Sequence, residues 1–74
     1  MQPRRLTENW KELHNNMTRV EVRRLLGEPR RVESRGILGE VWYYPDAQGR
    51  VPSLEVQPGT LSFAHEKLDW WSEP

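Results

Sequence analysis

MTRVEVRRLLGEP, residues 17–29, is the stretch around which the rest of the chain is organised. Thr18 is a good helix N-cap, because its hydroxyl can accept a hydrogen bond from an unpaired first-turn N–H, and Glu21 stands where its carboxylate can return the bond to the Thr18 N–H. An apolar stripe at helical spacing is formed by Val22, Leu25 and Leu26. Gly27 can take the positive φ that closes a helix, and Pro29 prevents continuation. The stretch predicts a short helix with both ends encoded, which packs its stripe against a larger element.

The composition describes one small domain held together by packing alone. With 74 residues the chain makes a single domain, and a domain of this size buries only about 60% of the surface of its unfolded chain. Four Trp, two Tyr and one Phe are expected to supply much of the core. The absence of cysteine excludes disulfides and thiolate zinc sites. We expect a flexible arm over residues 1–6 and one domain over residues 7–72.

The pattern of the remaining segments predicts the α+β fold class. Thr7 can cap a first short helix from about Glu8 to Asn15, in which Trp10 and Leu13 form the apolar pair. Strand-like segments occur at residues 30–37, 40–45, 60–64 and 68–71, with a shorter alternating piece at residues 54–56. We therefore expect two short N-terminal helices packed on one face of a three- to four-stranded antiparallel sheet.

Alternation of side chains along the strands sorts the aromatic residues onto two faces of this sheet. The face that we expect the helices to cover carries Trp42, Tyr44, Leu61, Phe63 and Trp70. Tyr43 and Trp71 are then left on the uncovered face, where exposed Tyr and Trp are typical of interaction hot spots. A register change of one residue would reverse this assignment.

The net charge is zero, but the basic residues are not evenly spread. Five arginines crowd one third of the chain: Arg23, Arg24, Arg30, Arg31 and Arg35. Such a cluster usually means a solvated helix face and a guarded edge strand. It can also bind an anionic partner such as a lipid headgroup, while the interleaved acidic residues argue against a nucleic-acid surface. The candidate partner-binding residues are Tyr43, Trp71, Arg23, Arg24, Arg30 and Arg31.

No constellation of catalytic or metal-binding residues is visible in the sequence. His14 and His65 lie far apart and form no helical metal pair. The serines lack the setting of a nucleophile elbow, and the isolated glycines make no phosphate-cradling loop. We therefore expect a protein that is not an enzyme and that holds no cofactor and no metal.

The sequence also limits where the protein can act. No apolar run approaches the ~18 residues of a membrane span, and residues 1–9 contain no apolar signal-peptide core. We expect a cytoplasmic protein, or a protein of the periplasm or outer membrane if a targeting sequence was removed. Membrane contact would then require a lipid anchor on the removed segment or headgroup contact through the arginines.

Several motifs together resemble a known family. They are Leu13-x-x-Asn16-Met17-Thr18, Val22-x-x-Leu25-Leu26-Gly27-x-Pro29, Trp42-x-Tyr44, Leu61-x-Phe63 and Leu68-x-Trp70. This combination resembles the SmpA/OmlA domain, the BamE-type outer-membrane assembly lipoprotein family, over roughly residues 8–71. The resemblance implies two helices on one face of an antiparallel sheet, an architecture that also occurs in β-lactamase inhibitory proteins.

Two functional hypotheses follow. The resemblance implies a non-enzymatic protein–protein interaction or scaffold module of bacterial envelope type, with a protein as its partner. The alternative is a soluble cytoplasmic domain that binds an anionic partner, a lipid headgroup or a nucleic acid, through its arginine-rich segment. Salt separates the two hypotheses, because binding that releases counterions weakens steeply as salt rises.

Overall fold

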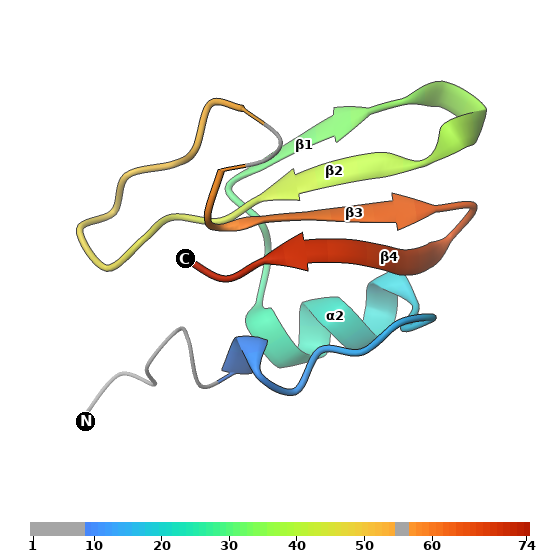
Figure 1. The fold of residues 1–74 in the computed structure, drawn as a ribbon, viewed down its shortest axis with the longest axis horizontal. Coiled ribbons are helices and arrows are strands. Elements are labelled where there is room, and N and C mark those ends of the chain that lie inside the picture. Colours follow the sequence, from blue (N-terminus) through green and yellow to red (C-terminus); the bar gives the residue numbers. More distant parts are fainter. Residues whose placement is uncertain (1–8, 55–56) are drawn as a thin grey trace.

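The structure is a computed structural model that describes residues 9–54 and 57–74. The predicted arm and the expected helix start at Thr7 lie outside the described residues. Four strands form one antiparallel sheet in the order β1-β2-β3-β4, so that each strand pairs with its neighbour in sequence (Figure 1). The elements are α2 (Arg19–Leu26), β1 (Arg31–Ser34), the 3₁₀ turn η1 (Gly36–Leu38), β2 (Glu40–Tyr43), β3 (Thr60–Ala64) and β4 (Lys67–Ser72). The predicted α+β class and antiparallel sheet are confirmed, and the sheet has four strands where three to four were predicted.

Helix α2 begins and ends as its sequence predicts. The Thr18 Oγ1 accepts a hydrogen bond from the Glu21 N–H at 3.2 Å, and the Glu21 Oε1 accepts one from the Thr18 N–H at 2.9 Å. At the other end Gly27 has a φ of 89°, and its N–H donates to the Arg23 carbonyl at 2.8 Å. Both ends therefore satisfy backbone groups that a helix of this length leaves unpaired.

The prediction of two N-terminal helices is wrong, because the described residues contain one helix, α2. Residues 9 and 10 are helical, but the following N–H groups of Glu12 and Leu13 donate to carbonyls only three residues back. The chain then leaves the helical path and reaches the edge of β4, where Asn16 N–H donates to the Leu68 carbonyl at 2.9 Å. Asn16 has a φ of 74°, a left-handed conformation that Asn tolerates better than most residues. Pairing with β4 thus replaces the end of the predicted helix.

β1 and β2 are shorter than predicted, β4 extends one residue further at each end than the predicted residues 68–71, and the bounds of β3 are confirmed. β1 ends at Ser34, because Gly36 has a φ of 66° and starts a 3₁₀ turn. β2 ends at Tyr43, before Pro45. Of the alternating piece at residues 54–56, Leu54 lies in a bend and the other two lie outside the described residues. The long connection from β2 to β3 extends beyond the end of the sheet (Figure 1).

The helix side of the sheet holds the hydrophobic core. Its buried cluster consists of Trp10, Leu13, Met17, Val22, Trp42, Tyr44, Leu61, Phe63 and Leu68. The rings of Trp42 and Phe63 meet edge to face at 4.7 Å between centroids, and those of Trp10 and Tyr44 at 5.6 Å. The Tyr44 hydroxyl donates to the Gly27 carbonyl at 2.8 Å and ties the end of α2 to the end of β2. The predicted positions of Trp42, Tyr44, Leu61 and Phe63 on the covered face are confirmed.

A β-bulge in the last hairpin decides which of two adjacent tryptophans faces the core. The pairing of β3 with β4 shifts between Ser62 and Phe63, so that Ser62 is opposite Trp70 and Phe63 is opposite Leu68. One extra residue therefore stands between Leu68 and Trp70, and the two no longer share a face. Trp71 packs against the core, whereas Trp70 is 39% exposed on the other face. The predicted faces of Trp70 and Trp71 are wrong and must be exchanged.

Candidate functional site

The side of the sheet opposite α2, called here the open face, is built from two cross-strand rows. One row runs Glu33, Val41, Ser62 and Trp70, and the other runs Arg31, Tyr43, Thr60 and Ser72. The central residues Val41, Tyr43 and Thr60 are each at most 1% exposed. Trp70 is the large apolar residue of these rows that remains exposed. The open face therefore presents one aromatic side chain beside a buried platform.

Tyr43 lies on the open face as predicted, but it is buried by a polar network. The Arg31 guanidinium lies 4.0 Å from the centroid of the Tyr43 ring, a cation–π contact. The Tyr43 hydroxyl donates to the Glu33 Oε1 at 2.5 Å. Arg31 Nη2 also donates to the Pro52 carbonyl at 3.3 Å and links β1 to the long connection. Tyr43 is thus a structural anchor of the open face, with 1% of its surface exposed.

The same network shifts the protonation of its members. The hydrogen bond from Tyr43 lowers the pKa of the Glu33 carboxyl, and the neighbouring Arg35 guanidinium acts in the same direction. Burial raises the pKa of the Tyr43 hydroxyl, and the Glu33 carboxylate adds to that rise. Glu33 therefore stays charged to a lower pH than an ordinary glutamate, and Tyr43 stays neutral to a higher pH than an ordinary tyrosine.

Two arginines of α2 lie over aromatic rings on the covered face of the sheet. The Arg23 guanidinium lies 5.0 Å from the Trp42 ring centroid, and its Nε is 3.0 Å from the Glu28 Oε2 in an ion pair without hydrogen-bond geometry. Arg19 lies 5.5 Å from the Phe63 ring centroid and 3.1 Å from the Glu40 Oε1. The two guanidinium groups therefore shield aromatic rings of the core from solvent.

The predicted arginines do not form one patch. Arg23 lies on the helix side and Arg31 on the open face, each stacked on a ring. Arg24 and Arg30 are exposed, and neither makes an ion pair within the described part of the chain. Trp71, the other predicted aromatic residue of the site, packs on the core. The structure therefore separates the six predicted residues between both faces of the sheet and the helix.

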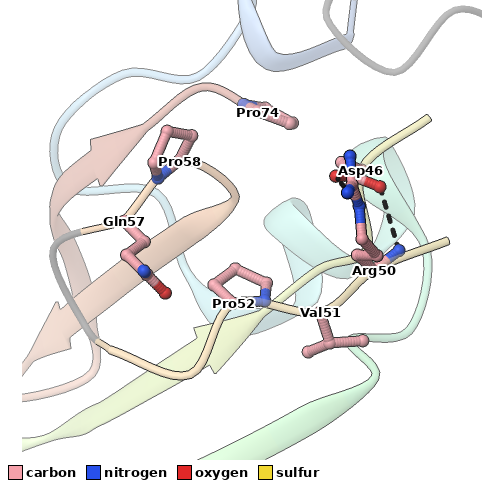
Figure 2. Close-up of a pocket in the computed structure, with 7 residues that line it drawn as sticks. All are labelled: Asp46, Arg50, Val51, Pro52, Gln57, Pro58 and Pro74. Atoms are coloured by element: carbon pink, nitrogen blue, oxygen red, sulfur yellow. Dashed lines mark hydrogen bonds and ion pairs between the residues drawn. The ribbon is translucent and has the colours of Figure 1, made fainter. Parts of the chain in front are cut away.

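A hollow of about 250 Å³ lies in the long connection (Figure 2). Its walls are Asp46, Arg50, Val51, Pro52, Gln57, Pro58 and Pro74. Its charged groups interact with the loop itself. The Asp46 Oδ1 accepts hydrogen bonds from the N–H groups of Gln48 and Arg50, and the Asp46 Oδ2 forms an ion pair with the Arg50 Nε at 3.3 Å. The backbone N–H of Arg50 is the main cause that lowers the pKa of the Asp46 carboxyl. The Asp46 carboxylate therefore has a structural role, which is to close this turn.

Neither metal-binding nor membrane-spanning features occur among the described residues. No group of three or more His, Asp or Glu side chains there is placed to hold a metal ion. No helix among them is both long and apolar enough to cross a membrane.

Sequence reasoning missed Trp70 because strict alternation was applied to β4. Leu68 and Trp71 both face the core, and they are three residues apart. A spacing of three between inward residues is the trace that a bulge leaves in a strand. The adjacent pair Trp70-Trp71 would have suggested a choice between two registers, but it could not have decided between them.

The comparisons with protein-family models, with curated proteins and with solved structures each find no match. Function is therefore inferred from the geometry of the chain and from its motifs.

Proposed function

We propose that this chain is a non-enzymatic protein-binding module whose contact centre is Trp70 on the open face. The observation that carries the proposal is the 39% exposure of Trp70 on the side of the sheet that α2 does not cover. Trp is enriched in interaction hot spots, because one side chain offers a large apolar area and a polar N–H.

The platform beneath Trp70 supports this role. Its row neighbours Ser62 and Val41 belong to the two central strands, and Val41 is 1% exposed. A rigid sheet fixes the backbone of the contact residue before the partner arrives, so less conformational entropy is lost on binding. A partner with an apolar pocket for the indole ring fits this surface.

We place the module in the bacterial envelope, in outer-membrane assembly, on the strength of the motif resemblance. The motif segments contact one another: the Tyr44 hydroxyl donates to the Gly27 carbonyl, and Val22 and Trp42 belong to one buried cluster. Residues quoted for the resemblance therefore act as one structural unit, as residues of a shared fold would. The proposed location is the periplasm or the outer membrane.

The alternative, an anionic partner bound through the arginine-rich segment, has less structural support. Binding of a phosphate or headgroup cluster needs several free cations on one surface. Arg23 and Arg31 lie on opposite sides of the sheet and are stacked on rings. Arg24 and Arg30 are the exposed members that remain for such a site.

The test is quantitative affinity capture from the envelope fraction of the source cells, with the purified domain as bait. Trp70→Ala should lower the amount of captured partner about tenfold or more, as loss of a hot spot does. Val20→Ala is the matched control, because Val20 is 53% exposed on α2 and away from the open face. The capture should persist as salt is raised.

The capture experiment also distinguishes the alternative. If Trp70→Ala binds as the wild type does, the proposal is wrong. Loss of the partner in Arg24→Glu/Arg30→Glu alone, together with loss at raised salt, would establish the anionic-partner hypothesis instead. Fractionation of the native protein into the cytosol would contradict the envelope location.

A further inference from the structure

The two edges of the sheet differ. The outer edge of β4 is covered by the chain itself, because Asn16 N–H donates to the Leu68 carbonyl at 2.9 Å and Leu68 N–H donates to the Met17 carbonyl at 2.7 Å. β1 is the strand at the opposite edge (Figure 1), and all of its residues are exposed. Within residues 9–54 and 57–74, no strand pairs with this outer edge. An uncovered edge strand offers backbone groups to another strand.

The hydrogen-bond pattern of the β1–β2 hairpin shows which backbone groups of β1 are free. Arg35 N–H donates to the Gly39 carbonyl at 2.7 Å, in the same register as the β1–β2 pairing. Bonded pairs alternate along an antiparallel ladder, so the odd-numbered residues of β1 bond to β2. The N–H and C=O groups of Val32 and Ser34 therefore point away from the sheet.

We propose that β1 pairs with β1 of a second copy of this chain, antiparallel and in a register centred on Val32. A two-fold axis perpendicular to the sheet through that point joins the two sheets into one. Val32 then lies opposite Val32 of the second copy, and both residues direct their free N–H and C=O groups at each other. In the same register Arg31 of each copy lies opposite Glu33 of the other.

The charges at this edge are arranged for such a self-complementary pair. Arg31 and Glu33 occupy the same face of β1, both exposed, and both are held by Tyr43: the ring lies 4.0 Å from the Arg31 guanidinium, and the hydroxyl donates to the Glu33 carboxylate at 2.5 Å. In the dimer each Arg31–Glu33 pair is a position without direct backbone bonds, where side chains approach most closely. Opposite charges in that position stabilise a strand pair, and like charges destabilise it.

The neighbouring register is disfavoured by the same residues. Pairing centred on Glu33 would place Glu33 opposite Glu33 of the second copy, and Arg31 opposite Arg35. Charges of one sign along an edge repel other copies and guard against association. Here the sign alternates about Val32, so the register centred on Val32 is attractive. That register also covers the Val32 side chain, which is 49% exposed in the single chain.

The dimer is expected to be weak and reversible, because an edge contact between two short strands lies at the small end of protein interfaces. It uses the outer edge of β1 and leaves Trp70 on β4 free. Self-association through β1 is therefore independent of the protein partner proposed for the open face.

Sedimentation of charge variants up to about 1 mM tests the proposal, a range suited to weak association. Arg31→Glu places Glu against Glu33 of the second copy, and Glu33→Arg places Arg against Arg31. Each variant alone should dimerise about tenfold or more weakly than the wild type. An equimolar mixture of the two should form a heterodimer, because every cross-strand pair is then of opposite charge. Arg24→Glu on α2 is the control of equal charge change, and it should dimerise as the wild type does.

A backbone variant tests the edge without changing charge. Val32→Pro removes the outward N–H and no β1–β2 hydrogen bond, so it should give a folded monomer, with folding checked by circular dichroism. A wild-type chain that stays monomeric over the whole concentration range would overturn the proposal. Unimpaired dimers of both single charge variants, or no heterodimer in their mixture, would overturn it as well.

Discussion

The two faces of the sheet bury their central residues by different means. On the helix side Trp42 is 0% exposed, beneath α2 and in edge-to-face contact with Phe63. On the open face Tyr43 is 1% exposed, although no helix within the described residues covers it. Its cover is polar: the Arg31 guanidinium over the ring and the Glu33 carboxylate at the hydroxyl.

This difference shows how a small domain can leave one sheet face available. Apolar packing on the helix side carries most of the stability, since buried apolar area is the main favourable term of folding. On the open face, the side chains of Arg31 and Glu33 from the edge strand β1 exclude water from Tyr43. The central residues of this face are therefore buried without a second layer of helices, and Trp70 remains accessible.

The largest loss of stability is expected from a substitution in the core on the helix side of the sheet. Trp42→Ala should lower the free energy of unfolding by about 3–5 kcal/mol, because it removes a fully buried ring and leaves a cavity. That is a large part of the stability of so small a domain. Urea denaturation followed by circular dichroism measures it, with Val20→Ala as the exposed control. A loss equal to that of Val20→Ala would show that Trp42 is not in the core.

The adjacent tryptophans of β4 give the most closely matched comparison of the two faces. Trp71→Ala should cost roughly 2 kcal/mol of unfolding free energy, because Trp71 is partly buried against the core, and Trp70→Ala should cost less than about 1 kcal/mol. Thermal and urea unfolding of both variants measures the difference. Equal losses, or a larger loss for Trp70→Ala, would contradict the assignment of the faces.

A smaller effect, on the pH dependence of stability, is expected from the polar network on the open face. The lowered pKa of Glu33 means that the unfolded chain binds this proton more tightly, so the contribution of Glu33 to stability is present above its ordinary pKa of 4.5 and is lost as pH falls through the lowered value. Tyr43→Phe removes the main cause of the lowered pKa. The variant should lose less stability on acidification than the wild type does, as measured by thermal unfolding between neutral and acidic pH. An unchanged pH dependence would show that the Tyr43–Glu33 bond does not act this way.

Local signals in the sequence were sufficient where chemistry is local. The Thr18–Glu21 capping box and the Gly27 stop encode α2 completely, because each involves residues within one helical turn. β3 was predicted with its bounds, since its alternation is regular and it lies between its two partner strands.

The rest depends on contacts between distant segments. The N-terminal chain leaves its helical path because residues 16 and 17 pair with Leu68. The bulge that turns Trp70 outward is set by pairing with β3, and no glycine in β4 marks it. The candidate site was therefore only partly predictable: the face of Tyr43 could be derived from alternation, whereas its burial and the exchange of Trp70 and Trp71 could not.

The orientation of the two tryptophans is tested most directly by nuclear Overhauser contacts of their ring protons in the labelled wild-type domain. We expect contacts from the Trp71 ring to the Leu61 side chain and from the Trp70 ring to Ser62, as the pairing of β3 with β4 requires. Contacts from Trp70 to Leu61 and from Trp71 to Ser62 would contradict it, and would remove Trp70 from the proposed binding surface.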